Sequence, residues 1–255
     1  MLQYFKIYHT QIQTFLSLYT LKKVKRRKMM KLNGQMSESY LIGSLLTAVG
    51  GYLDAYTYLA RGSVFANAQT GNIVLFGINM AEQNYKKALF YLVSIITFGF
   101  GIAISEIIRD RFKEHNDYIH WRQIIVLIET AVVLSVAFIK SDIVSNTLVS
   151  FVCALQVQTF KKMNGHRLAT TMCTGNLRTA TESLFKAVKT KDKFHVQKSI
   201  QFFEVILIFI LGAVLGAVIT GIYGVKSVLF AAVPLIVCFV IMFIDTEKEE
   251  KNEDC

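Results

Sequence analysis

The 24 residues from Ile200 to Tyr223 read IQFFEVILIFILGAVLGAVITGIY and contain a single charged side chain, that of Glu204. A helix rises about 1.5 Å per residue, so roughly 20 residues cross the ~30 Å hydrocarbon layer of a membrane. A buried helix of a soluble protein rarely reaches this length without a polar stripe. The stretch therefore predicts a membrane-spanning helix.

Five further stretches of similar length and apolarity lie before and after this one. Each holds at most one acid, and the apolar residues run continuously instead of alternating, which predicts helices and not barrel strands. We therefore expect an all-α, polytopic membrane bundle with six full spans. The other five ranges are Tyr40–Ala60, Ala88–Ile108, Gln123–Ile139, Ile143–Phe160 and Ser227–Ile244.

The composition agrees with this class. Apolar residues make up 53% of the 255 residues and charged residues only 18%, against about 45–50% and 25% in soluble domains. These values disfavour a disordered chain, a coiled coil and an ordinary cytosolic enzyme. The motifs of soluble catalysis are missing from any suitable context, and the four cysteines have no CxxC spacing. We therefore expect no enzymatic activity, no metal and no cofactor.

Two more polar segments share the tripeptide Thr-Gly-Asn (TGN). Val64–Ala81 reads VFANAQTGNIVLFGINMA, and His166–Lys186 reads HRLATTMCTGNLRTATESLFK. The triplets begin at residues 70 and 174, an offset of 104, and the same offset carries Gln123 onto Ser227, where the last span begins. The chain therefore reads as a duplicated half, with repeats at 40–140 and 144–244. Each repeat has three spans and one TGN helix, which is either re-entrant or buried among the spans.

The net charge of +10 indicates topology and not nucleic acid binding, because no basic face lies on a soluble domain. With six spans and re-entrant TGN segments, 23 of the 28 Lys and Arg residues lie on the cytoplasmic side, together with both termini. If both TGN segments cross the membrane completely, the chain has eight spans. The asymmetry is then weaker, with 18 basic residues on the cytoplasmic side and 9 outside. The positive-inside rule favours six spans, and the eight-span alternative stays open.

Three spans per repeat is an odd number, so the two repeats have inverted orientations in the six-span arrangement. The TGN segments then enter the membrane from opposite sides and meet near its midplane, which is a recurring plan of transporters.

The chain ends lie outside this bundle. The N-terminal residues carry a basic cluster from Lys22 to Lys31 after a mixed segment that is too polar to span. One interpretation is an amphipathic arm that lies on the membrane surface, and the other is a translation start at Met29, Met30 or Met36. The boundaries we expect are 1–39 for the arm, 40–245 for the membrane domain and 246–255 for a charged tail.

Polar residues of the TGN segments and neighbouring spans are the candidates for a central site. Asp54 lies deep within the first span, where an acid costs several kcal/mol unless it is paired or hydrated. Thr caps helix starts, and two helix N-termini aimed at one point favour an anionic group or a polar solute. The structural alternatives are that Asp54 is a structural acid near the outer membrane face, hydrogen-bonded to a Tyr or to the TGN segment, and that the TGN segments serve tight helix packing. The candidate binding residues are Asp54, Asn67, Gln69, Thr70, Gly71, Asn72, Gln158, Thr174, Gly175 and Asn176.

The same residues carry a resemblance to a known family. Two signatures occur in order. The first is Gly50-Gly51-Tyr52-Leu53-Asp54-Ala55, then Phe65-Ala66-Asn67 and the first TGN, and the second is Ala154-Leu155-Gln156 followed by the second TGN. Together they resemble the YoaK-like family of bacterial integral membrane proteins, a domain of unknown function. The resemblance covers about residues 36–245 and implies a location in the bacterial inner membrane. It implies no substrate. The family usually has Gln-Asn-Ala in its second signature, whereas this chain has Gln156-Val157-Gln158.

These features together predict a transporter or permease for a small solute or ion. Its partners are membrane lipids and that solute, and its site lies where the two TGN segments meet. The alternative is a non-transporting partner subunit or a lipid-interacting scaffold, and a membrane-embedded enzyme is a more distant third hypothesis.

Overall fold

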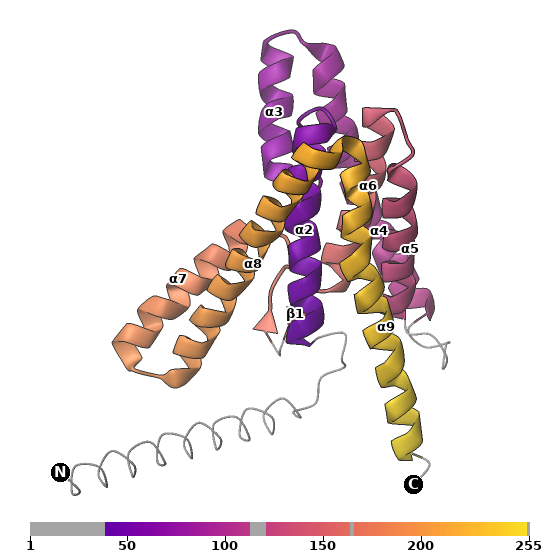
Figure 1. The fold of residues 1–255 in the computed structure, drawn as a ribbon. Coiled ribbons are helices and arrows are strands. Elements are labelled where there is room, and N and C mark those ends of the chain that lie inside the picture. Colours follow the sequence, from indigo (N-terminus) through magenta and orange to yellow (C-terminus); the bar gives the residue numbers. More distant parts are fainter. Residues whose placement is uncertain (1–38, 113–120, 164–165, 254–255) are drawn as a thin grey trace, which may run out of the picture. The chain divides into compact units, whose positions relative to one another are not determined.

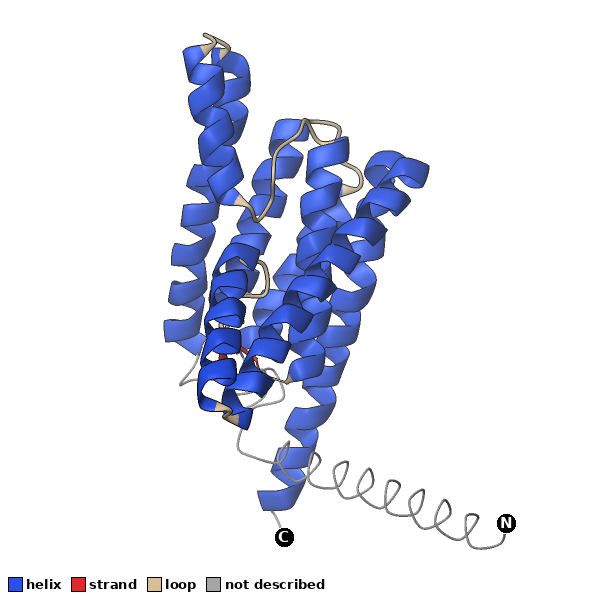
Figure 2. Cartoon of the chain, turned by 90° about the vertical axis from the view of Figure 1, so that its left-hand side faces the viewer, coloured by secondary structure: helices blue, strands red, loops and turns tan. Residues whose placement is uncertain are grey.

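The computed structural model describes residues 39–112, 121–163 and 166–253, with side chains up to residue 242. Most of the predicted N-terminal arm and the side chains of the predicted charged tail therefore lie outside the described residues. The described part is helical apart from its turns and one antiparallel strand pair, so the predicted all-α class is confirmed (Figures 1 and 2). The elements are α2 (Tyr40–Ala60), α3 (Gln69–Ala81), α4 (Tyr85–Phe112), α5 (Trp121–Val136), α6 (Asp142–Thr159), β1 (Lys162–Met163), β2 (His166–Arg167), α7 (Cys173–Thr190), α8 (Lys193–Tyr223), the 3-10 helix η2 (Gly224–Ser227) and α9 (Val228–Glu253).

The helix ends follow from local capping chemistry. Ser39 begins α2 by accepting a hydrogen bond from the Ile42 amide at 3.3 Å, and Asp192 begins α8 by accepting one from the Phe194 amide at 2.9 Å. Such N-caps satisfy amides that have no partner within the helix. The two TGN segments are helical only in part, because the helices begin at Gln69 and Cys173 and the residues before them are extended or turned.

Helices α2 and α8 run in the same direction and lie in close contact. The Tyr40 hydroxyl donates to Glu204 at 2.8 Å near the start of the pair. Further along, Gly212 faces the Ala48 carbonyl and Gly216 faces the Tyr52 carbonyl. Contacts therefore occur in the same order along both helices, so the helices are parallel. A Cβ at either glycine would lie within 2.8 Å of a backbone atom. Small residues here therefore let the two backbones approach closely, as at helix interfaces in membranes.

Helices α4 and α6 form a second parallel pair. The hydroxyls of Ser94 and Ser150 lie 2.7 Å apart, and those of Ser105 and Thr159 lie 3.0 Å apart further along both helices. Between these contacts, Gly101 packs against the Phe151 carbonyl. The 104-residue offset carries most of α2 onto α6, and most of α4 onto α8. Each helix pair is therefore the counterpart of the other under the predicted repeat.

Helices α2 and α6 run in opposite directions. Gln156, near the end of α6, donates to the Leu46 carbonyl in the first half of α2 at 3.0 Å. Asn146, near the start of α6, donates to the Arg61 carbonyl just after the end of α2. The two helices that correspond under the offset therefore have inverted orientations.

Arg61 binds the ends of three helices together and is 1% exposed. Its guanidinium donates to the Tyr56 hydroxyl at 2.7 Å, to the carbonyls of Val136 and Ile139 at 3.0 Å each, and to Asp142 at 3.3 Å. These groups lie at the end of α2, just after α5 and at the start of α6. A single charge thus satisfies carbonyls that a helix end leaves without partners.

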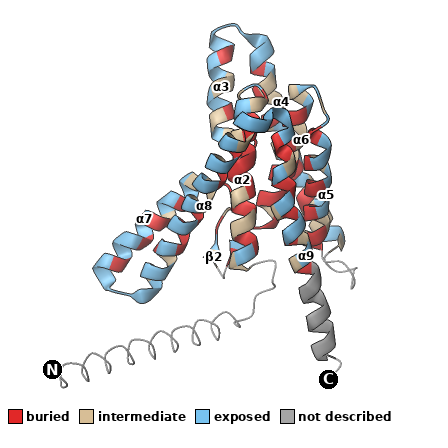
Figure 3. Ribbon diagram, viewed as in Figure 1, coloured by how far each residue is buried: buried red, intermediate tan, exposed pale blue. Residues whose placement is uncertain are grey.

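The main core lies among α2, α5, α6 and α9, and Figure 3 shows buried residues concentrated there. Large apolar side chains remain exposed on all the described α-helices, in particular along one face of α8. Two helical stretches in the described part are long and apolar enough to cross a membrane, Tyr85–Phe112 and Lys193–Met242. These stretches agree with association with a membrane. The exposed α8 side chains include Leu207, Ile210, Leu211, Val214, Leu215 and Val218.

Candidate functional site

The segment before α3 turns back along the helix that it has just left. Gly62 and Ser63 adopt positive φ angles of 80° and 63°, which reverse the chain after α2. The returning segment reaches the middle of α2, where the Asn67 amide donates to Asp54 Oδ1 at 2.6 Å and Asn67 Nδ2 donates to the Gly50 carbonyl at 3.2 Å. Helix α3 therefore begins beside the midpoint of α2 and not beside its end.

The segment before α7 reaches the same part of α2. Gln156 Nε2 donates both to the Leu46 carbonyl at 3.0 Å and to the Thr170 hydroxyl at 3.3 Å, so Thr170 lies next to α2. The Thr171 methyl packs on Gly50 so closely that a Cβ at that glycine would lie 2.3 Å from it. Because α6 and α2 are antiparallel, the two segments arrive at Gly50 from opposite ends of the bundle. We call this place, defined by Leu46, Gly50, Asp54, Asn67, Gln156, Thr170 and Thr171, the meeting point.

The asparagines of the two TGN triplets hold these segments in corresponding ways. Asn72 Nδ2 donates to the Phe65 carbonyl at 2.7 Å, and Asn176 Nδ2 donates to the Ala169 carbonyl at 2.7 Å. Both bonds reach back seven residues, and the 104-residue offset carries one onto the other. Asn72 also accepts from the Phe65 amide at 3.0 Å. The TGN asparagines therefore fasten each extended segment to the first turn of the helix that follows it.

The family model described as Protein of unknown function (DUF1275) matches residues 42–241. The chain belongs to the DUF1275 family. This confirms the resemblance found in the sequence, and the matched residues include both TGN segments. Comparisons with curated proteins and with solved structures find no match.

Seven of the ten predicted binding residues of this DUF1275 chain fall into three groups. Asp54 and Asn67 lie at the meeting point. Gln69 and Gly71 form a second group, which stabilises the turn at the start of α3. Gln69 bonds to the Ala66 carbonyl and to Asn72, and Gly71 packs on Phe65. A third group, Thr70, Thr174 and Gly175, is exposed. The buried Asn72 and Asn176 hold the backbone of their own segments, and Asn72 also donates to Gln69 and to the Ser94 hydroxyl on α4 at 3.3 Å. In the described part of the chain, neither asparagine bonds to a residue of the meeting point.

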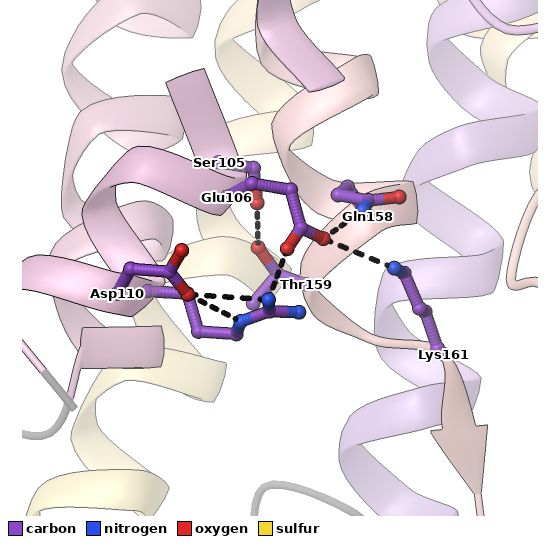
Figure 4. A network of polar contacts seen from close by, with 7 residues as sticks. Ser105, Glu106, Asp110, Gln158, Thr159 and Lys161 are labelled. Atoms are coloured by element: carbon purple, nitrogen blue, oxygen red, sulfur yellow. Dashed lines mark hydrogen bonds and ion pairs between the residues drawn. The ribbon is translucent and has the colours of Figure 1, made fainter. Parts of the chain in front are cut away.

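Gln158 lies apart from the meeting point, in a polar network where α4 and α6 end (Figure 4). Its side-chain amide donates to Glu106, which also accepts from Lys161 at 3.2 Å and pairs with Arg109. Arg109 in turn pairs with Asp110 at 3.2 Å. Figure 4 shows the Gln158 and Lys161 side chains directed toward the Glu106 carboxylate, beside the Ser105–Thr159 contact.

Three polar residues at the meeting point, Gln156, Thr170 and Thr171, were not among the predicted binding residues. Gln156 is 1% exposed and bonds to the Leu46 carbonyl, and Thr171 is 6% exposed and packs on Gly50. Gln156 and Thr171 had a signal in the sequence. Gln156 is a polar residue inside a long apolar span, and the offset of 104 carries Asn67 onto Thr171.

Proposed function

We propose that this chain is an integral membrane transporter or permease for a small solute or ion, with its central site at the meeting point. The observation that carries the proposal is that two half-helices, α3 and α7, both begin beside the midpoint of α2 and extend from it toward opposite ends. Broken helices that start near the midplane form the binding sites of many transporters with inverted repeats.

In this proposal the helices α2, α4, α5, α6, α8 and α9 are the spans, and α3 and the more polar α7 are re-entrant. Helix α3 has 13 residues, so at about 1.5 Å per residue it is roughly 20 Å long and too short to cross ~30 Å of hydrocarbon. The apolar residues exposed on α8 then face lipid tails. The distribution of basic residues supports cytoplasmic termini, and the family resemblance supports the bacterial inner membrane.

The two inverted halves are the second support. Corresponding helices α2 and α6 run antiparallel, and each packs in parallel with a long helix from the other half. Relative movement of two such halves around a fixed site opens it to one side and then to the other. Extended backbone is tolerated at membrane depth only where it is buried in protein or lines a cavity, and the residues of both segments that lie beside α2, Asn67, Thr170 and Thr171, are buried.

The test is solute flux into proteoliposomes that contain the full chain. A panel of small solutes is first screened for thermal stabilisation of the detergent-solubilised protein, and those that stabilise it are then tested for uptake. Asp54→Asn removes the buried charge at the meeting point and is expected to lower flux at least tenfold. Glu182→Gln, at an exposed site on α7, is the matched control and should keep wild-type flux.

Two results contradict the proposal in different ways. Wild-type flux in Asp54→Asn at every pH tested shows that Asp54 has no role in transport. Failure of every stabilising solute to enter the vesicles shows that the meeting point is not a transport site.

A further inference from the structure

The orientation of the two amide side chains at the meeting point is fixed by their partners. The carbonyls of Gly50 and Leu46 can only accept hydrogen bonds, so the atoms of Asn67 and Gln156 that face them must be the NH₂ groups. Each amide oxygen is therefore turned away from its α2 carbonyl. Neither side chain can be flipped without placing an oxygen against an oxygen.

Both amide oxygens, Asn67 Oδ1 and Gln156 Oε1, and the Thr171 hydroxyl oxygen Oγ1 are buried without hydrogen-bond partners among the described residues. The side chains of Asn67, Gln156 and Thr171 are 6%, 1% and 6% exposed. Asn67 also lies beside the Cys153 thiol, which is only a weak donor and no substitute for an amide or hydroxyl. A buried acceptor without a partner costs about 1–3 kcal/mol. These three belong to residues that contact α2 within one turn, between Leu46 and Gly50, which indicates a site that is completed by a ligand.

The charge at the meeting point is negative. Asp54 accepts the Asn67 amide at 2.6 Å, and within the described residues it forms no ion pair with Lys, Arg or His. Its carboxylate therefore already lies where the N-terminal end of α3 favours negative charge. A second anion here would be repelled by the Asp54 carboxylate, and the amide oxygens of Asn67 and Gln156 could not donate a hydrogen bond to it. The anionic ligand that the two helix N-termini suggested from the sequence is disfavoured.

We propose that the ligand at the meeting point is a small monovalent cation, either an alkali metal ion or an ammonium group. This inference rests on the proposed transport function and specifies its substrate class. Carboxylate, amide and hydroxyl oxygens are the donors that hard cations prefer, and the same oxygens accept the N–H bonds of an ammonium group. The described residues contain no cluster of three or more His, Cys, Asp or Glu side chains, which fits an alkali ion and not a transition metal.

The test measures thermal stability of the full chain in detergent at constant ionic strength and constant chloride. Sodium, potassium or methylammonium chloride replaces N-methylglucamine chloride, whose bulky cation does not fit. The melting temperature should rise with the concentration of at least one small cation and then saturate. The separate sodium, potassium and methylammonium series distinguish an alkali ion from an ammonium group. A parallel anion series, with N-methylglucamine as the only cation, should give no saturable shift.

Matched threonine variants connect the response to this place. Thr171→Val removes one of the three oxygens without changing side-chain shape, and is expected to weaken the apparent cation affinity about tenfold or more. Thr171→Ser keeps the hydroxyl and should keep the response. Thr130→Val is the control, because the Thr130 hydroxyl already bonds to the Val126 carbonyl of its own helix at 2.7 Å.

The inference is overturned if anions stabilise the protein and cations do not, if no cation does so, or if Thr171→Val responds as Thr130→Val does. These outcomes are separate from failure of the transport proposal. Saturable cation binding without any flux refutes transport, whereas flux of an anion or neutral solute refutes the cation and leaves transport standing.

Discussion

Replacement of Gly51 by alanine tests the close packing of α2 on α8, which places the meeting point. A Cβ at Gly51 would lie 2.1 Å from the Phe209 carbonyl oxygen and 3.0 Å from the Ala213 amide nitrogen. Carbon and oxygen rarely approach more closely than about 3.3 Å, so the two helices must separate by roughly 1 Å. Both contacts are with backbone, so no side-chain rotation relieves them. Overpacking of this kind costs about 1–3 kcal/mol.

Gly221, on α8, provides the matched control because a Cβ there meets no atom within 4 Å. Alanine gains up to about 1 kcal/mol of helix propensity over glycine at either position. The difference between Gly51→Ala and Gly221→Ala therefore isolates the packing cost. At about 2–4 °C per kcal/mol for a chain of this size, Gly51→Ala should melt about 2–12 °C below Gly221→Ala.

The assay is the apparent melting temperature of the purified protein, measured by the loss of the monodisperse peak in size-exclusion chromatography after heating at fixed times. Scan conditions must be identical because unfolding in detergent is a rate as well as an equilibrium. Equal melting temperatures for the two variants would refute the reasoning, because they would mean that α2 and α8 do not approach as closely as described.

Two further predictions concern buried ionisable side chains. Arg61→Leu removes the donor of the buried Tyr56 hydroxyl and of the Ile139 carbonyl and should cost about 1–3 kcal/mol, with only partial recovery in Arg61→Lys because an ammonium lacks the planar fork. A melting temperature within 2 °C of wild type would contradict it. Glu129 is fully buried on α5, and neither of its carboxyl oxygens has a hydrogen-bond partner among the described residues. Glu129→Met should therefore raise the melting temperature, and a lower value would mean that the carboxyl binds something the apolar side chain cannot.

Much of the architecture could be predicted from hydropathy and from one repeated tripeptide. The offset of 104 carries Gln69, the first residue of α3, onto Cys173, the first residue of α7. It also carries Asn72 onto Asn176, which make equivalent hydrogen bonds. These features follow from sequence because a long apolar run and a helix start each have a local physical cause.

The choice of glutamine at the meeting point could not be predicted from the same offset. The offset of 104 pairs Asp54 with Gln158, but in the structure it is Gln156 that contacts α2. The reason is that the link between α2 and α3 covers residues 61–68, whereas the link between α6 and α7 covers 160–172 and contains the β1–β2 pair. Helix α6 therefore ends earlier than its counterpart, and Gln158 lies in its last turn beside Glu106. The roles of the TGN asparagines were likewise hidden, because their backbone partners depend on how each segment folds back.

The most direct test of the account is the side of the membrane on which the two half-helices turn back. Single cysteines replace Lys86, after α3, and Lys191, after α7, in a chain whose native cysteines are changed to serine. Intact cells are then treated with a membrane-impermeant thiol reagent. Inverted re-entrant half-helices predict labelling of Lys86→Cys from outside and of Lys191→Cys only after the cells are opened. The same accessibility at both positions, which eight complete spans require, would contradict the account.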